Sequence, residues 1–322
     1  MAARVRGCLI GAVVAGGLAV LVVAVATAVL LRRGGEPPPS PAPSPSPRAL
    51  RVLEEKRLDE RRMELRLRSQ ALEAETGVRL LLPEGWSKDA GRTWPVLWLL
   101  HGGLDGYTAW TAKTDVDRLT RGDDVIVVMP DGGRCGSYSD WWNGGRGGPP
   151  RWETYHLKEL LPLLEARYRA GPRRAVAGYS MGGQGAMLYA AKGHFKAAAS
   201  FSGALHILQP GVPQAVMAGT ALGCFGTDWR RIWGDPERQR AIWRAHNPYD
   251  QVARLRGVRL YVAAGDGDLV EQLANRAARA FAERAREEGI DVRTHFTRGG
   301  HNHDTWQREL HRAYPMLLSA LR

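Results

Sequence analysis

The chain has 322 residues and a formal net charge of +12, carried mostly by arginine. After the N-terminal segments described below, roughly 260 to 270 residues remain, which is enough for one large domain and excludes two. The arginines are scattered and no recognition module for nucleic acid is visible, so we expect no nucleic-acid partner. We expect most of the arginines to be solvated on the surface. A basic domain of this kind would be attracted to anionic phospholipid or cell-wall surfaces.

The first 33 residues predict a membrane segment. Residues 8–31 are apolar and uncharged, and roughly 20 such residues span a bilayer as a helix. Residues 26–28 (Ala-Thr-Ala) would also serve as the small-residue cleavage site of a secretory signal. We favour an uncleaved transmembrane anchor over a signal sequence. Either fate puts the rest of the chain outside the cytoplasm, on a cell membrane or secreted.

Residues 34–48 predict a linker, because a segment rich in Pro and Ser cannot bury a core and favours extended polyproline II. Residues 49–322 form the predicted globular domain. At its start, residues 48–62 are charge-dense with leucines at roughly helical spacing. We expect a short amphipathic helix there, with a solvated extension of the linker as the alternative.

Strand and helix patterns alternate through residues 49–322, which predicts an α/β fold with a mostly parallel central sheet and helices on both faces. Buried strands are expected over residues 174–177, 257–264 and 292–296, and a helix over residues 183–191. Between residues 202 and 247 the alternation lapses. The tryptophans of this segment (Trp229, Trp233 and Trp243) predict a lid or cap near the site, and plain packing of bulky aromatics is the alternative.

The most specific motif is Gly178-Tyr179-Ser180-Met181-Gly182. A serine in a G-x-S-x-G pentapeptide between a strand and a helix is presented on a sharp turn as a nucleophile, and the glycines let strand and helix approach closely. Such a serine needs a histidine base and a carboxylate that orients the base, in the chain order serine, acid, histidine. We therefore predict Ser180 as the nucleophile of an acyl-transfer enzyme, with chance occurrence of the pentapeptide as the alternative.

Both partners occur downstream of Ser180. The strand 257–264 runs into a turn that ends at Asp268, and Glu271 follows one helical turn later. The strand 292–296 runs into a loop with His301 and His303, of which we choose His301 as the base. Asp268 is the preferred acid, because a short carboxylate held in a turn orients an imidazole with little loss of rotamer entropy. Glu271 is the alternative acid, and ordinary turn chemistry is the alternative explanation of the aspartate.

Metal and cofactor sites are not expected. His301 and His303, with Asp304 beside them, are of metal-binding residue types, but this one short cluster offers no clear third protein ligand at a recognisable spacing. Cys135 and Cys224 either pair in an oxidising compartment or stay free, which their spacing does not decide.

From residue 63 onward the chain resembles an esterase branch of the α/β hydrolases that includes feruloyl esterases, S-formylglutathione hydrolases and the antigen 85 mycolyltransferases. Residues 94–103 resemble the strand and oxyanion loop of these enzymes, and residues 127–133 resemble their next core strand. Gly300-His301, followed by Trp306, resembles their catalytic-histidine segment. The resemblance implies the α/β hydrolase fold. Among the branch's members, the mycolyltransferases match Asp140, Trp141 and Trp142 most closely, which implies that these three residues bind substrate.

An acyl-transfer site also needs backbone donors for the oxyanion, typically one after the nucleophile and one in the loop after an early strand. By comparison with the family these are Met181 and Gly103, with an ordinary glycine turn as the alternative for the second. His101 departs from the family, because the mycolyltransferases carry there an aspartate that the resemblance links to sugar binding. At the acid, the esterases have an aspartate at the position of Asp268, and the mycolyltransferases have a glutamate at that of Glu271.

We therefore expect a membrane-anchored or secreted serine esterase that hydrolyses an acyl ester, from a lipid or glycolipid among others, through an acyl-serine intermediate. An acyltransferase of the mycolyltransferase type, which moves the acyl group to a sugar or glycolipid, is the first alternative. Because His101 replaces the acid, hydrolysis is expected to dominate when trehalose is offered. A non-catalytic cell-envelope binding protein on a hydrolase scaffold is the second alternative.

Overall fold

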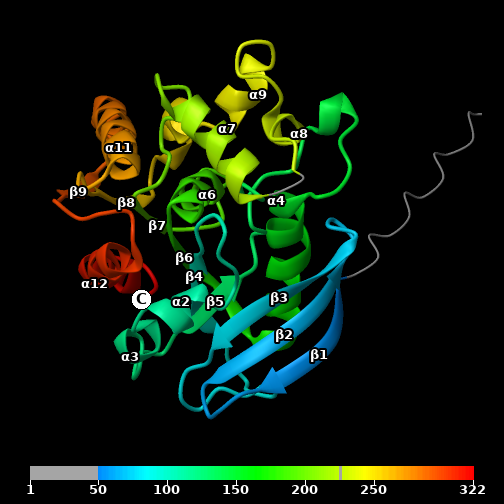
Figure 1. Cartoon of the computed structure of the whole chain (residues 1–322). Coiled ribbons are helices and arrows are strands. Elements are labelled where there is room, and N and C mark those ends of the chain that lie inside the picture. Colours follow the sequence, from blue (N-terminus) through cyan, green and yellow to red (C-terminus); the bar gives the residue numbers. More distant parts are fainter. Residues whose placement is uncertain (1–49, 225–226) are drawn as a thin grey trace, which may run out of the picture. The chain divides into compact units, whose positions relative to one another are not determined.

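A nine-stranded sheet forms the centre of the part of the chain that the structure describes, residues 50–224 and 227–322 of a computed structural model (Figure 1). Its strand order is β1-β2-β3-β5-β4-β6-β7-β8-β9. The pairs from β1 to β5 in this order are antiparallel, and all pairs from β5 through β9 are parallel, so the predicted mostly parallel sheet is confirmed. The strands are β1 (Arg51–Arg57), β2 (Arg62–Ser69), β3 (Ala74–Leu81), β4 (Trp94–Leu100), β5 (Ile126–Pro130), β6 (Ala170–Tyr179), β7 (Ala197–Phe201), β8 (Arg259–Ala264) and β9 (Val292–Phe296).

The central strands are apolar on both faces, as parallel strands covered by helices on both sides must be. Side chains of β4 alternate between two cores. Val96, Trp98 and Leu100 join the core on one face of the sheet, and Leu97 and Leu99 join the core on the other. The strand β2, which lies between β1 and β3, buries every second side chain, because only one of its faces is covered.

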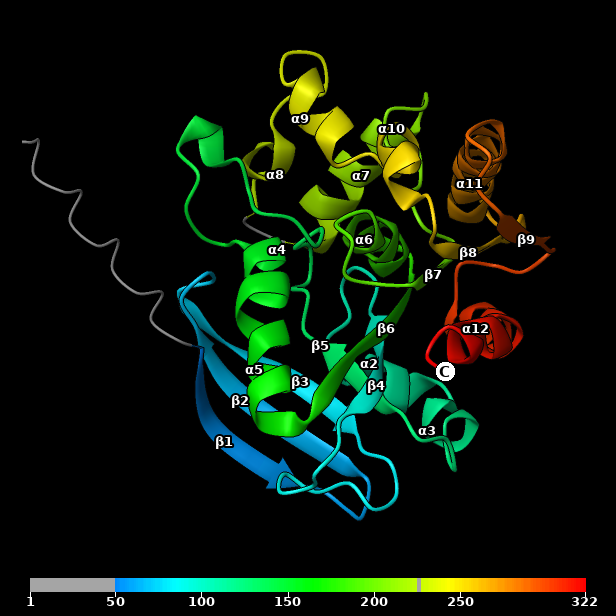
Figure 2. The same ribbon diagram turned by 180° about the vertical axis from the view of Figure 1, so that it is seen from behind.

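Helices cover both faces of the sheet (Figures 1 and 2). The helices α2, α3 and α12 contribute to one core, and α5, α6 and α11 contribute to the other. The helices are α2 (Ala109–Lys113), α3 (Val116–Leu119), α4 (Trp152–Thr154), α5 (Leu161–Tyr168), α6 (Met181–Ala190), α7 (Val212–Gly223), α8 (Arg230–Trp233), α9 (Arg240–Ala245), α10 (Pro248–Gln251), α11 (Leu269–Glu287) and α12 (His303–Ser319), with short 3-10 or π segments η1 (Asn143–Gly145), η2 (Tyr155–Leu160) and η3 (Val252–Leu255).

The segment between β7 and β8, where the alternation of strand and helix lapses, forms a cap from α7 to α10. Trp233 and Trp243 are buried in it and meet edge to face, with ring centroids 5.2 Å apart. They form a small apolar cluster with Trp141 and Ile207, separate from the two cores of the sheet. These two tryptophans therefore stabilise the cap by packing.

The helix predicted over residues 48–62 is wrong for the part that the structure describes. Residues 51–57 form β1, which pairs antiparallel with β2 so that Arg57 faces Met63. The turn between the two strands is held by Asp59, whose carboxylate accepts the backbone N–H groups of Arg61 and Arg62. Pairing along the edge of a sheet has overridden the helical spacing of the leucines, because tertiary context outweighs local propensity.

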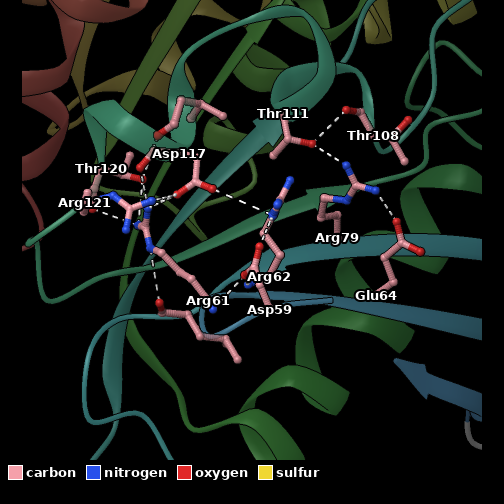
Figure 3. A network of polar contacts seen from close by, with 12 residues as sticks. Asp59, Arg61, Arg62, Glu64, Arg79, Thr108, Thr111, Asp117, Thr120 and Arg121 are labelled. Carbon is pink, nitrogen blue, oxygen red and sulfur yellow. Dashed lines mark hydrogen bonds and ion pairs between the residues drawn. The ribbon is translucent and has the colours of Figure 1, made fainter. Parts of the chain in front are cut away.

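Arg61 fastens this turn to the helical layer (Figure 3). Its guanidinium donates to the backbone and side chain of Asp117 and to the carbonyl and hydroxyl oxygens of Thr120, at 2.5 to 2.8 Å. Its Nε also donates to the carbonyl of Leu82, at 3.3 Å. These contacts join the antiparallel edge of the sheet to α3.

The predicted membrane segment (residues 1–33) and linker (residues 34–48) lie outside the described residues. Across residues 50–224 and 227–322, no helix combines the length and the apolar character needed to cross a membrane.

Candidate active site

Ser180 lies between β6 and α6 with a φ of 53° and a ψ of −123°. A positive φ is unfavourable for a residue with a side chain and is held here by its neighbours. A Cβ at Gly178 would lie 2.2 Å from the carbonyl oxygen of Gly182, and a Cβ at Gly182 would lie 2.3 Å from that of Leu100. Both glycines are therefore required by the close approach of strand and helix, which is the physical basis of the pentapeptide.

The side chains of Ser180, His301 and Glu271 form a continuous hydrogen-bonded line. The Nε2 atom of His301 lies 3.0 Å from Oγ of Ser180, and its Nδ1 atom lies 2.8 Å from Oε1 of Glu271. Glu271 is fully buried, and its other oxygen accepts the backbone N–H of Gly265 at 2.5 Å. Since a carboxylate only accepts, Nδ1 carries the proton and Nε2 is free to take the proton of the serine.

The structure does not bring Asp268, the preferred acid, to the imidazole. Asp268 caps the N-terminus of α11, where Oδ1 accepts the backbone N–H of Glu271 at 2.9 Å and Oδ2 accepts that of His301 at 2.7 Å. Burial raises the pKa of Asp268, but these two backbone donors outweigh it and keep the pKa below its ordinary value. Both carboxylate oxygens of the short Asp268 side chain accept backbone N–H groups at the helix N-terminus. The longer side chain of Glu271, in the first turn of α11, reaches Nδ1 of His301.

The two residues predicted to hold the oxyanion, Gly103 and Met181, both line the cavity that contains Ser180. Met181 is the first residue of α6, so its backbone N–H has no acceptor within the helix. The loop before Gly103 passes close to the nucleophile, because a Cβ on Gly102 would lie 3.2 Å from Cβ of Ser180. Leu104 N–H donates to the carbonyl of Arg134 at 2.8 Å and holds the far side of this loop.

Asp105 anchors the loop that carries Gly103, a role that the sequence did not indicate. Its carboxylate accepts the hydroxyl of Tyr179 at 2.6 Å, contacts Nε2 of His303 at 3.1 Å and pairs with Lys113. Burial raises the pKa of Asp105, and the hydrogen bonds from these three partners lower it below its ordinary value. His303 thus serves the loop and makes no contact with Ser180.

The indole ring of Trp306 packs against the rings of Tyr179 and His301. Its ring stacks on Tyr179 with centroids 4.3 Å apart and lies perpendicular to the ring of His301, with centroids 4.9 Å apart and planes at 89°. Its Nε1 donates to the hydroxyl of Ser202 at 3.1 Å. Trp306 therefore restricts the imidazole ring of His301 to the orientation that faces Ser180.

No group of three or more His, Cys, Asp or Glu side chains within the described ranges is arranged to hold a metal ion. His301 and His303 have separate partners, Glu271 and Asp105.

An apolar cavity of about 450 Å³ opens beside Ser180. Its far wall is built by one face each of α7 and α11, which approach each other where a Cβ on Gly211 would meet Leu273 at 3.2 Å. The apolar lining from these helices consists of Val212, Ala215, Val216, Val270, Leu273, Ala274 and Ala277. The predicted cap therefore contributes to the site through α7, and not through its tryptophans.

Asp140, Trp141 and Trp142, the expected substrate-binding residues, do not line this cavity. Asp140 accepts the backbone N–H and hydroxyl of Thr154, at 2.9 and 2.5 Å. Trp141 is buried in the cap cluster and donates to the carbonyl of Gly136 at 3.2 Å. Packing and helix capping occupy the side chains of Asp140 and Trp141. Trp141 does line a neighbouring hollow of about 530 Å³.

His101, which replaces the family's aspartate, is buried and shapes the loop. Its Nε2 accepts the backbone N–H of Gly132 at 2.8 Å, and its Nδ1 lies 2.8 Å from the carbonyl oxygen of Gly102. With Nε2 as an acceptor, Nδ1 is the protonated nitrogen. His101 does not line the cavity.

A disulfide joins Cys135 to Cys224 across 89 residues of sequence. It links the loop after β5, which also carries Arg134, to the C-terminal end of α7. Arg134 and Cys135 line both the cavity at Ser180 and the neighbouring hollow, so the disulfide separates the two. It holds one end of the cavity wall in place.

Comparison with known proteins places these features in a family. Residues 69–317 match the family model described as "Putative esterase". Esterase Rv1288 of Mycobacterium tuberculosis is 35% identical over 266 residues, which cover 78% of this chain but only 58% of that protein. Diacylglycerol acyltransferase/mycolyltransferase Ag85B of Mycolicibacterium smegmatis is 29% identical over 257 residues, covering 70% of this chain and 77% of the relative. The crystal structure of Mycobacterium tuberculosis MPT51 aligns with a TM-score of 0.64 and 26% identity, covering 79% and 96% of the two chains. The family model spans most of the described domain, and the chain belongs to the esterase family.

Proposed function

We propose that the protein is a serine esterase that cleaves acyl esters through an acyl-serine intermediate. The observation that carries the proposal is the line from Ser180 Oγ through His301 to the buried Glu271, with contacts of 3.0 and 2.8 Å, at the end of an apolar cavity. A hydroxyl is a weak nucleophile at neutral pH and needs such a base beside it.

In the first half of the reaction, His301 Nε2 takes the proton of Ser180 while Oγ attacks the carbonyl carbon. The backbone N–H groups of Met181 and Gly103 stabilise the resulting oxyanion. The protonated imidazole is stabilised by Glu271, and it then gives its proton to the departing alcohol. In the second half, His301 activates a water molecule, which releases the acid and restores Ser180.

The cavity favours an aliphatic acyl group. Its walls on α7 and α11 carry apolar side chains apart from Thr220, whose hydroxyl already donates to the carbonyl of Val216. The charged side chain of Arg134 reaches the cavity from the loop after β5. Burial of a methylene group in such a pocket contributes about 0.8 kcal/mol. We expect esters of medium-chain fatty acids to be cleaved with a lower KM than acetate esters.

Acyl transfer to an alcohol is the second candidate function. It is favoured by Glu271, which occupies the position at which the mycolyltransferases carry their acid, and by the similarity to Ag85B over 77% of that protein. Hydrolysis and transfer share the acyl-serine and differ in whether water or a bound alcohol accepts the acyl group. His101 leaves the acceptor side without the acid of the mycolyltransferases, so we keep hydrolysis as the main reaction.

An extracytoplasmic location belongs to the same proposal. The Cys135–Cys224 disulfide supports it, since disulfides persist in oxidising compartments. The uncharged segment 8–31 would anchor the chain or direct its export.

The test is hydrolysis of p-nitrophenyl esters of increasing chain length by the wild type and by Ser180→Ala. Ser180→Ala should lose activity by a factor on the order of 10⁴ or more. Ser137→Ala is a matched control, because Ser137 lines the same cavity without a histidine partner among its contacts in the described chain, and it should stay within about tenfold of wild type. Activity of purified Ser180→Ala near that of the wild type would contradict the mechanism, and a folded but inert wild type would favour a binding protein.

A further inference from the structure

Exposed large apolar side chains gather at the mouth of the cavity. Over residues 50–224 and 227–322, those with more than a third of their surface exposed are Leu58 (38%), Leu104 (48%), Leu222 (73%), Leu269 (71%) and Val270 (53%). All except Leu58 belong to this mouth. Leu104 and Val270 line the cavity itself, Leu269 precedes Val270 at the start of α11, and Leu222 precedes Gly223, where a Cβ would lie 2.6 Å from Leu104.

The helix α7 extends this apolar surface. From residue 201 to residue 227 the sequence has no Asp, Glu, Lys or Arg. Yet α7 lies at the surface of the domain, and Ala215, Ala218, Ala221 and Leu222 are exposed. A surface helix normally directs charged side chains to the solvent. An exposed helix without any charge indicates a face that contacts something other than water.

A lipid surface fits this face better than a protein does. A second copy of the chain or a protein partner seated on Leu104, Leu222 and Val270 would close the entrance to Ser180. A lipid surface would instead deliver the ester into the cavity from the membrane side. Arg134, exposed and lining the cavity, adds a cation that suits phosphate headgroups, although Asp266 in the turn before α11 is also exposed.

We propose that Leu104, Leu222, Leu269, Val270 and the outer side of α7 form a docking face (the apolar rim) that inserts into a phospholipid surface, so that the enzyme draws lipid esters from it. This deepens the proposed function and rests on it for the role of Ser180. The rim itself is a binding surface and can be tested without catalysis.

The binding test uses the full chain with an environment-sensitive fluorophore at Leu222→Cys or at Leu58→Cys, each with Cys8→Ser so that the introduced thiol is the reactive one. The vesicles are mixtures of phosphatidylglycerol and phosphatidylcholine with brominated acyl chains. The label at position 222 should be quenched strongly and that at position 58 weakly, whatever the N-terminal segment contributes to attachment. Equal quenching of both labels, or none at position 222, would overturn the proposal.

The activity test compares the double variant Leu222→Ser/Leu269→Ser with the control Leu58→Ser, since none of these residues lines the cavity. On a soluble short-chain ester all should match the wild type. On a long-chain ester embedded in vesicles the double variant should be slower by about tenfold or more, because two largely exposed leucines no longer partition into the lipid. Equal rates on vesicles, or a loss confined to the soluble ester, would overturn the proposal.

Two further outcomes separate the rim from the proposed function and from a protein partner. Ser180→Ala should lose both activities and keep the quenching at position 222, so a loss of quenching in Ser180→Ala would count against the rim. If the wild type hydrolyses no ester but is quenched at position 222, the esterase proposal fails and the rim stands. If the wild type sediments as a dimer and Leu222→Ser/Leu269→Ser as a monomer, the rim is a protein interface and the lipid proposal is overturned.

Discussion

Replacing Glu271 by glutamine tests which carboxylate supports the imidazole. In the wild type one oxygen of Glu271 accepts Nδ1–H of His301 at 2.8 Å and the other accepts Gly265 N–H at 2.5 Å. A glutamine of the same size has only one acceptor oxygen. Its NH₂ group would face the Gly265 donor, or would face Nδ1 and force the proton onto Nε2, where it blocks transfer from Ser180.

The expected loss is large because the negative charge that stabilises the imidazolium also disappears. A comparable acid-to-amide change in a serine protease lowers kcat by about 10⁴. For Glu271→Gln we expect a fall in kcat of roughly 10³ to 10⁴, which corresponds to about 4 to 5.5 kcal/mol of transition-state stabilisation. Asp268→Asn should stay within about tenfold, because asparagine also caps helices and only one backbone hydrogen bond of about 1 kcal/mol is lost.

The assay is the steady-state hydrolysis of a p-nitrophenyl ester by both variants, with thermal unfolding as the check on folding. A similar melting temperature for the two variants with a kcat ratio of 10² or more would support Glu271. If Asp268→Asn loses more activity than Glu271→Gln while both remain folded, Glu271 is not the carboxylate that supports His301.

Further predictions concern the base, the disulfide and pH. His301→Ala should lower kcat as severely as Ser180→Ala, while His303→Ala should lower it only mildly through the loop around Asp105; the reverse order in the same ester assay would move the base to His303. Reduction of Cys135–Cys224 should lower the free energy of unfolding in urea by about 4.6 kcal/mol, from the entropy of closing an 89-residue loop, and Cys135→Ser/Cys224→Ser should be insensitive to reductant; an unchanged wild type would show that the bond does not form. His156 is fully buried between Tyr189 and the carbonyl of Asp131, and burial lowers its pKa to about 3. The unfolded state therefore binds a proton below pH 6.5 that the folded state does not, and stability should fall by about 2 kcal/mol from pH 7 to pH 5; His156→Gln should flatten this slope, and equal slopes would contradict the assignment.

The sequence was most informative where backbone geometry demands particular residues. A Cβ at Gly178 or Gly182 would lie only 2.2 or 2.3 Å from a backbone carbonyl oxygen, so both positions require glycine. The turn at Ser180 could therefore be predicted from the sequence. The sequence favoured Asp268 over Glu271 on side-chain length, whereas the structure places Glu271 at the imidazole. Both residues lie at the start of α11, and the one whose side chain caps the helix is not available to the imidazole of His301.

Other features depend on contacts between distant segments. The Cys135–Cys224 pair and the cavity wall between α7 and α11 arise only when the cap folds against the sheet. Trp141 matched a family pattern, but the cap cluster buries it away from Ser180. Local spacing also misled over residues 48–62, because the pairing of β1 with β2 is a long-range property of the sheet edge.

Covalent labelling of the wild type with a fluorophosphonate ester, followed by peptide mass spectrometry, reports directly whether Ser180 is an activated nucleophile. A phosphonate reacts with a serine only where a base and an oxyanion site activate it. We predict one adduct, on the peptide that contains Ser180, no adduct in Ser180→Ala, and labelling at least about 10³ slower in Glu271→Gln. Hydrolysis of esters by a wild type that is labelled at another residue, or at none, would show that Ser180 is not the nucleophile.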